Sequence, residues 1–465
     1  MESSVEVKKQ SFFLDPAVLL LVFGWSLSSQ IVTNQILKQT CLFTFEYSDV
    51  ICTQLDDKSS TNLIEQEIQP YVAKVLMTIT VLNSIIPTIM SLFLGQWSDN
   101  YGRKKVINGL FIGCSVSLAW ITAVSFISEG IAPISPWNFV FAQLPFMLGG
   151  GMPTLIIVVL CHVTDQTNED NRSARLTIFE IVVFMGVLIA IASSSFILEA
   201  TNATTVFTIS VLCVVLGSCI EIFLVKETMN VKHEIGIIDQ YKDLFTFERV
   251  KELFEIVTQK RTNKRGRILV FLMIISLLTN FTASGSSTVF YLFMRQKMGW
   301  NLQDWTIYEA VTMLLTVFGA VISLVVLKKR FKLSDLSLSI IALASLMFDA
   351  LIKTVATRTW QFYVASVVAL FKIISGPMLR TIMSTVVFKT EISRIYSITS
   401  SIEAISGLGS APLYSATYTA TLITFPAAFN LITAGTFALS LVLAVFILRW
   451  MKSASSNDKT ADTRL

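Results

Sequence analysis

The chain has 465 residues, of which 53% are hydrophobic and only 15% are charged, against about 25% in an average soluble domain. This composition excludes a disordered chain, a collagen-like chain and a small disulfide scaffold, and it requires much apolar surface to face lipid. The net charge of +4 is too small to indicate nucleic acid binding. Six cysteines without C-x-x-C spacing and two histidines give no support for a metal site or a cofactor.

Twelve apolar segments are long enough to cross a membrane, which takes about 20 residues. Because irregular backbone cannot face lipid, we predict an all-α membrane protein of twelve helices in two six-helix halves. The N-terminal half is 1–226, the linker is 227–265, and the C-terminal half with its tail is 266–465. The predicted helices are 16–37, 71–97, 104–128, 137–163, 174–199, 204–226, 267–294, 304–328, 333–355, 360–388, 392–420 and 424–450.

The first segment decides how the chain starts in the membrane. Lys8 and Lys9 precede it, so a cleaved signal peptide is the alternative interpretation, but its apolar run is too long for a signal h-region. Of the 36 Lys and Arg residues, 27 lie on the side of the termini and 7 on the opposite side. Because Lys and Arg are enriched in cytosolic loops, we predict that both termini are cytosolic.

Polar residues recur at helical spacing on the first and seventh predicted helices. Gln30 and Asn34 lie one turn apart on the first, Asn280 lies on the seventh, and Gln143 lies on the fourth. These residues are candidate substrate contacts around a cavity. Polar stripes also hold membrane helices together by hydrogen bonds, so this alternative stays open for each of them.

The outer face carries two candidate modification sites. Cys41 and Cys52 lie in the polar segment 38–70, where an oxidising exterior allows a disulfide, although two free thiols are the alternative. Asn202 begins an Asn-Ala-Thr sequon in the predicted outer loop between helices five and six. The sequence therefore predicts a glycan there.

The loop between helices two and three carries the most specific motif of the chain. Gly95 and Gly102 allow a tight turn, Asp99 can lie near the next helix N-terminus, and Arg103 can pair with an acid or with helix-end carbonyls. Such a cluster can hold one transport conformation closed and release it in another. A plain basic loop that only sets the topology is the alternative interpretation.

Charged residues inside the predicted membrane helices are costly and are functional by default. Lys372 and Arg380 lie on the tenth helix, on either side of a Gly-Pro pair that frees backbone groups. Two cations beside a helix break favour an anionic substrate. Internal pairing of these cations with Glu403 or Glu180, for structural reasons alone, is the alternative.

The Gly-x-x-x-Asp-x-x-Gly-Arg spacing at 95–103 resembles the signature of the major facilitator superfamily. The chain further resembles the proton-coupled folate transporter family of solute carriers, in segments 95–105, 165–180 and 376–397. The resemblance implies proton-linked uptake, or lysosomal export, of organic anions or small polar conjugates. It also implies that Glu180 serves proton coupling and that Arg380 binds substrate.

The chain departs from that family at three points. Asn100 replaces the usual basic residue after the motif aspartate, the helix-four acid falls in the glycines 149–151, and the helix-seven histidine falls near Asn280. The folate substrate is therefore not expected. Glu403, nearer the membrane midplane, is the reserve candidate for proton coupling.

Two further segments suggest surface roles. Apolar residues at helical spacing over 247–257 predict an amphipathic helix, either on the cytosolic membrane surface or docked on the bundle. The C-terminal residues 463–465 match a short PDZ-domain ligand.

These features together predict a secondary transporter that works by alternating access of its two halves and takes a small anionic substrate, protons and a lipid bilayer as its partners. The chain has no P-loop for ATP and no hydrolase or zinc-peptidase motif, so an enzyme is not expected. A sensor or receptor on a transporter scaffold is the alternative function. The plasma membrane is favoured over the lysosomal membrane because the short tails carry no clear sorting signal.

Overall fold

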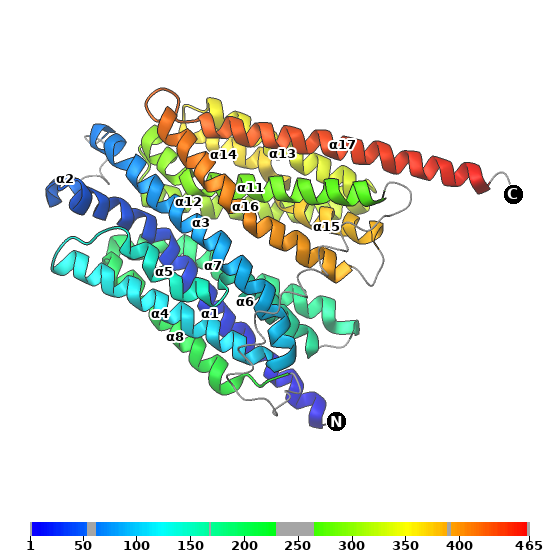
Figure 1. The fold of residues 1–465 in the computed structure, drawn as a ribbon, viewed down its shortest axis with the longest axis horizontal. Coiled ribbons are helices and arrows are strands. Elements are labelled where there is room, and N and C mark those ends of the chain that lie inside the picture. Colours follow the sequence, from blue (N-terminus) through cyan, green and yellow to red (C-terminus); the bar gives the residue numbers. More distant parts are fainter. Residues whose placement is uncertain (1, 54–61, 167–168, 229–264, 388–391, 463–465) are drawn as a thin grey trace. The chain divides into compact units, whose positions relative to one another are not determined.

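The computed structural model describes residues 2–53, 62–166, 169–228, 265–387 and 392–462, which form helices and short connections (Figure 1). The chain divides into two compact units. Unit 1 is Met1–Thr246 with Gly299–Ala310, and unit 2 is Phe247–Met298 with Val311–Leu465. The division falls inside the predicted linker, whereas residues 299–310, which we expected in the C-terminal half, group with unit 1. The predicted amphipathic helix and the PDZ ligand lie outside the described residues.

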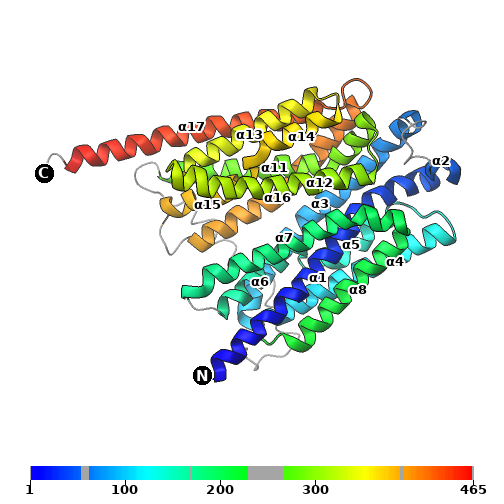
Figure 2. The ribbon, with the colours of Figure 1, turned by 180° about the vertical axis from the view of Figure 1, so that it is seen from behind.

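Unit 1 is built around its first helix. Its helices are α1 (Glu2–Gln39), α2 (Asp49–Thr53), α3 (Asn62–Tyr101), α4 (Arg103–Gly130), α5 (Asn138–Leu148), α6 (Gly151–Asp165), α7 (Glu169–Ala200) and α8 (Ala203–Leu224). α1 packs along α7 and α8, and α4 packs along α8 and α5 (Figure 2). α3 packs against α5 and α6. This arrangement brings α1, α3, α4 and α5 together around one interior space.

Unit 2 is organised around α11 and α13. Its helices are α11 (Arg265–Met298), α12 (Leu302–Ile322, whose first turns belong to unit 1), α13 (Asp335–Val355), α14 (Thr359–Val368), α15 (Ser375–Val386), α16 (Ile392–Thr421) and α17 (Ala428–Asp462). α11 packs along α16 and α17, and α13 packs along α17, α14 and α15. Leucine, isoleucine and methionine side chains from α11, α13, α15, α16 and α17 form the largest described core of this unit.

Apolar side chains also cover the outside of the helices, as a membrane protein requires. Phe223 on α8 is 80% exposed and Phe318 on α12 is 62% exposed. Eleven helices among the described residues are long and apolar enough to cross a membrane. α16, which matches the predicted segment 392–420, is not among them because it is rich in Ser and Thr and carries Glu403. Its 30 residues still extend about 45 Å, more than the hydrocarbon core of about 30 Å.

Three segments predicted as regular helices are interrupted or change their helix type. The segment 304–328 passes from α12 into a π-helical stretch over Ser323–Arg330. The segment 137–163 breaks between α5 and α6, where Gly150 and Gly151 have φ of 98° and 57°, values that residues with a Cβ rarely adopt. The segment 360–388 tightens into a 3₁₀ turn over Ala369–Ile374. Pro377 lacks the N–H that the carbonyl of Ile373 needs, so one hydrogen bond of a regular α-helix is lost at this point.

Candidate functional site: a cavity in unit 1 and an ion pair in unit 2

Unit 1 contains a half-open cavity of about 210 Å³ between four helices. Two amide side chains face it, Asn83 from α3 and Gln143 from α5, and the Asn83 Nδ2 lies 3.5 Å from the Gln143 Oε1. The lining residues are Trp25, Ser28, Ser29, Val32 and Thr33 from α1, Leu76, Ile79 and Asn83 from α3, Ile121 from α4 and Gln143 from α5.

One lining hydroxyl has no partner of its own. Ser28 is 2% exposed, and its Oγ makes no hydrogen bond. The neighbouring Ser29 donates instead to the carbonyl of Ser26 at 2.9 Å. A buried unpaired hydroxyl costs free energy unless a water or a ligand satisfies it, so Ser28 can bind a polar group in the cavity.

The predicted contacts Gln30 and Asn34 are not among the residues that line this cavity. Both are half-buried on α1, one position beyond Ser29 and Thr33, which do line it. One residue on a helix is a rotation of about 100°, so the predicted stripe lies beside the lining face. Asn83 was missed because the polar repeat of its segment, Thr80, Ser84 and Thr88, does not include it.

Unit 2 brings together three polar side chains from different helices. Arg380 on α15 donates from Nη2 to the Glu403 Oε2 on α16 at 3.1 Å. Ser276 on α11 also hydrogen-bonds the Glu403 side chain. The Arg380 side chain is 49% exposed, whereas that of Glu403 is 14% exposed. The structure therefore pairs Arg380 with Glu403, one of the two internal partners that the sequence left open.

The other predicted residues of unit 2 lie on α11 and in the turn before α15. Asn280 lies one turn from Ser276 on α11 and donates to its carbonyl at 3.1 Å. Lys372 lies in the 3₁₀ turn that precedes α15 and is half-buried. Glu180 lies on α7 of unit 1, and its side chain is outside the described part of the structure.

A second ion pair of unit 2 joins Asp349 and Lys353, both on α13. Asp349 is buried. Lys353, one turn later on α13, donates to its Oδ2 at 2.8 Å and lies 5.0 Å from the ring centroid of Phe290. The spacing i, i+4 on a helix is the sequence signal that could have indicated this pair.

The motif between helices two and three forms a polar cluster inside unit 1. Gly102, with φ of 110°, makes the turn between α3 and α4. Arg103 is buried and pairs through Nε with Asp165 at the end of α6. The carboxylate of Glu227 accepts the backbone N–H groups of Arg103 and Lys104, each at 3.0 Å. We expected the acid Asp99 to lie near this helix N-terminus. Among the described side chains, the acid that binds the N-terminus of α4 is Glu227.

The motif positions Gly95 and Asp99 lie in the last turns of α3. The side chain of Asp99 is outside the described part of the structure. Within the described ranges, no three His, Cys, Asp or Glu residues come together in a group that could hold a metal ion.

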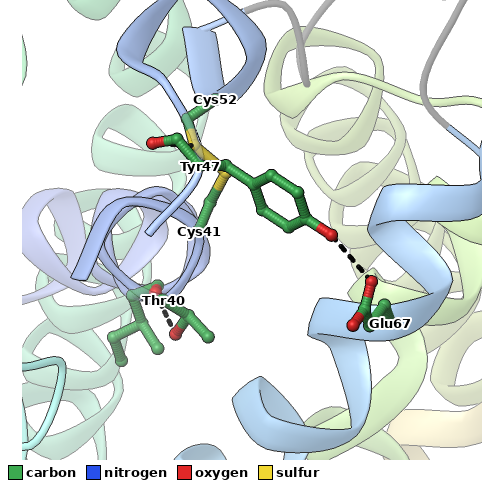
Figure 3. Close-up of a disulfide and its surroundings, with 6 residues drawn as sticks. Thr40, Cys41, Tyr47, Cys52 and Glu67 are labelled. Carbon is green, nitrogen blue, oxygen red and sulfur yellow. Dashed lines mark hydrogen bonds between the residues drawn. A yellow bond between two sulfur atoms is a disulfide. The ribbon is translucent and has the colours of Figure 1, made fainter. Parts of the chain in front are cut away.

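The end of α1 is tied down by a disulfide. Cys41 and Cys52 are bonded, with their Cα atoms 5.8 Å apart. Figure 3 shows Tyr47 between them and α3, where its hydroxyl donates to the Glu67 Oε2 at 2.8 Å. This hydrogen bond to a carboxylate raises the pKa of the Tyr47 phenol.

The exposed Asn202 caps α8, accepting the backbone N–H of Thr205 at 2.8 Å.

Comparisons with known proteins point to one superfamily. The sequence model described as Major Facilitator Superfamily matches residues 16–411. A Drosophila melanogaster protein named "Probable peptidoglycan muropeptide transporter SLC46" is 30% identical over 441 residues, 93% of this chain and 84% of that protein. The rat "Lysosomal proton-coupled steroid conjugate and bile acid symporter SLC46A3" is 25% identical over 444 residues, 92% of this chain and 93% of that protein.

Solved structures with the same fold are transporters. The human organic anion transporter MFSD10 matches with a TM-score of 0.63 at 12% identity, covering 94% of this chain and 99% of that chain. The POT family transporter PepTSo matches with a TM-score of 0.65 at 12% identity, covering 96% and 98%. At this identity the two matches show the fold alone.

Proposed function

Because this chain belongs to the major facilitator superfamily and, within it, to the SLC46 solute carriers, we propose that it carries small organic anions together with protons. The protein is a multi-pass membrane transporter, and carriers of this architecture open one site to each side of the membrane in turn. We assign the coupled binding of substrate and proton to the ion pair of Arg380 with Glu403.

The exposure of the two partners supports this assignment. Nearly half of the Arg380 side chain is accessible, and its planar guanidinium matches the geometry of a carboxylate or a sulfate. Glu403 is held on its inner side by Ser276 and by Arg380. The pair thus offers a cation to an incoming anion and a carboxylate to a proton.

Coupling follows from competition for Arg380. When Glu403 takes a proton, it loses the charge that holds the Arg380 guanidinium. A substrate anion then replaces Glu403 as the partner of Arg380. When the proton leaves on the other side of the membrane, Glu403 pairs with Arg380 again and displaces the substrate. Each ligand then strengthens binding of the other, because the coupling free energy between two sites is reciprocal. Glu180, nominated by the family resemblance, is the competing proton carrier.

The names of the relatives are compatible with this proposal. Rat SLC46A3 is named a proton-coupled symporter of steroid conjugates and bile acids, and a bile acid carries a carboxyl group. That relative is also named lysosomal, which makes the lysosomal membrane the alternative to the plasma membrane for this chain. Export of substrate from lysosomes uses the same inward proton gradient as uptake at the cell surface.

Uptake of radiolabelled cholate into proteoliposomes tests the proton step. Wild-type protein should accumulate cholate when the outside is acidic. Glu403→Gln, a permanent mimic of the protonated acid, should exchange cholate across the membrane but lose its accumulation by the pH gradient. Glu180→Gln should keep the wild-type pH profile. If the two variants behave the other way round, Glu180 is the proton carrier, and a flat wild-type profile removes proton coupling altogether.

The anion step has its own variants. Arg380→Gln should raise the KM for cholate at least tenfold. Arg380→Lys should restore only part of the lost affinity for cholate, because an ammonium lacks the planar fork of a guanidinium. The matched control is Lys328→Gln, which breaks another ion pair of the same unit, with Asp335 at 2.6 Å, and should change nothing. A wild-type protein that binds cholate in detergent but never accumulates it in sealed vesicles is a sensor.

A further inference from the structure

We infer that the connection between α12 and α13 binds an anionic phospholipid, one whose headgroup carries a phosphomonoester, at the membrane surface. The residues that carry the inference are Arg330, Phe331 and Lys332, which together form the basic loop. The inference goes beyond the proposed function, because it concerns neither the transported anion nor the proton. It assigns a lipid partner to a surface that the transport step does not use.

The basic loop lies where the chain leaves the membrane. One apolar span ends at Lys328 and the next begins at Asp335, so the residues between them lie at the level of the lipid headgroups. Four predicted helices separate the loop from the C-terminus, which places it on the side of the termini. We predict this side to be cytosolic, and the cytosolic leaflet is the one enriched in anionic lipids.

Two leucines fix the basic loop to the inside of unit 2. Leu327 and Leu333 pack against a small core formed by α13, α15 and the turn before α15. The backbone N–H of Phe331 donates to the carbonyl of Val326 at 3.0 Å, and that of Leu333 donates to the carbonyl of Leu327 at 3.2 Å. Because both leucines point inward and the backbone is bonded on both sides, the loop holds one conformation on the surface.

Lys332 occupies a backbone position that glycine usually takes. Its φ is 51°, and the bond from Leu333 back to Leu327 spans six residues, which is the Schellman arrangement at the end of a helix. Glycine adopts this conformation readily, whereas a residue with a Cβ does so rarely. A strained residue of this kind points to a use for its side chain, which here is an exposed ammonium.

Two cations of the basic loop are available to a ligand. Arg330 and Lys332 are exposed, and neither forms an ion pair with another residue that the structure describes. Lys328, by contrast, is neutralised by Asp335 at 2.6 Å. A phosphomonoester carries a charge of about −1.5 to −2 at neutral pH, which matches two cations. The guanidinium can bind two phosphate oxygens at once, and the ammonium adds a point charge.

The aromatic residue between the cations favours a lipid over a soluble phosphate. The Phe331 side chain is 65% exposed. A phenyl ring left in water forfeits the free energy that it gains among acyl chains, because apolar surface is more stable away from water. A phospholipid can place its phosphate on the two cations and its acyl chains against this ring. A soluble phosphate would meet the cations alone.

The test uses the full chain in a neutral detergent, with the binding of short-chain lipids measured by native mass spectrometry. Dioctanoyl phosphatidic acid, a phosphomonoester, should bind about fivefold more tightly than dioctanoyl phosphatidylglycerol, a phosphodiester with one charge fewer. Zwitterionic dioctanoyl phosphatidylcholine and acyl-free glycerol phosphate should each bind at least tenfold more weakly than phosphatidic acid. If phosphatidylcholine or glycerol phosphate binds as tightly as phosphatidic acid, the inference is overturned.

Charge variants locate the site. Arg330→Gln and Lys332→Gln should each weaken phosphatidic acid about fivefold, as expected for one basic residue at an anionic lipid surface. Arg330→Lys keeps the charge and should weaken it less. The matched control is Arg449→Gln, which removes an exposed cation from α17 in the same unit and should weaken it less than twofold. An equal loss in Arg449→Gln and Arg330→Gln would mean that net charge alone attracts the lipid, and the site would be wrong.

Two further variants test the ring and the strained backbone. Phe331→Ser should weaken phosphatidic acid at least fivefold and leave the binding of glycerol phosphate unchanged. Lys332→Gly should weaken phosphatidic acid as Lys332→Gln does while raising the Tm, because glycine suits the positive φ. Wild-type affinity in either variant contradicts the inference. Arg380→Gln should bind phosphatidic acid as wild type does, so the lipid site stands or falls independently of the proposed transport of anions and protons.

Discussion

Replacing Glu227 with alanine removes both hydrogen bonds that its carboxylate accepts from the first turn of α4. The two bonds are 3.0 Å long, to the amides of Arg103 and Lys104, and the side chain is half-buried. Loss of an N-terminal cap costs about 0.5–2 kcal/mol, and loss of a negative charge at a helix N-terminus adds about 0.3–1 kcal/mol. Because Glu227 satisfies two amides, we expect about 2 kcal/mol for unit 1.

That free energy can be measured locally and globally. Hydrogen exchange at the Arg103 and Lys104 amides should become about thirtyfold faster, since each 1.4 kcal/mol is a factor of ten. The apparent Tm should fall by about 4–8 °C for a unit of this size. Glu227→Gln keeps one acceptor and should fall between wild type and alanine.

A control keeps the result specific to the cap. Glu199→Gln removes an acid from the exposed end of α7 and should change neither the exchange rates nor the Tm. If Glu227→Ala leaves both amides protected within threefold of wild type, the carboxylate does not cap α4 and our account of this cluster is wrong.

Three further perturbations test other parts of the molecule. Replacing Cys41 and Cys52 with serine opens an 11-residue loop and should lower the free energy of unfolding by about 3 kcal/mol, measured by thermal unfolding without reductant. Asp349→Asn should destabilise unit 2 by about 3 kcal/mol because Lys353 loses its buried partner, and Asp349→Leu with Lys353→Met should recover most of the loss. Asn202→Asp keeps the α8 cap but should abolish any glycosidase-sensitive mobility shift; an unchanged shift places the glycan elsewhere.

The helices were predictable because hydropathy alone reports which segments can leave water. Their interruptions were not, since Gly150 and Gly151 adopt positive φ only where packing selects it. The partner of Arg380 was also open, because Glu180 and Glu403 lie on different helices and sequence distance does not say which helix packs beside α15. The superfamily and the SLC46 relatives, in contrast, were within reach of short motifs.

The face of α1 that lines the cavity could not be read from its pattern. Polar residues occur all around this helix between Ser26 and Gln39, so several stripes fit equally well. Gln30 and Asn34 form the longest repeat, yet Ser29 and Thr33 are the ones that line the cavity. Only the neighbours of each side chain distinguish a lining position from a packing position.

The polarity of α16 bears on how the protein is made. A helix that carries a glutamate and many hydroxyls partitions poorly from the translocon into lipid when it emerges alone, because an acid at the centre of a span costs about 2.5–3.5 kcal/mol. α16 packs along α11, which has been synthesised earlier, and Glu403 meets the cation of Arg380 on the preceding α15. We therefore expect α16 to be inserted together with its predecessors, so that the ion pair assists assembly before it takes part in transport.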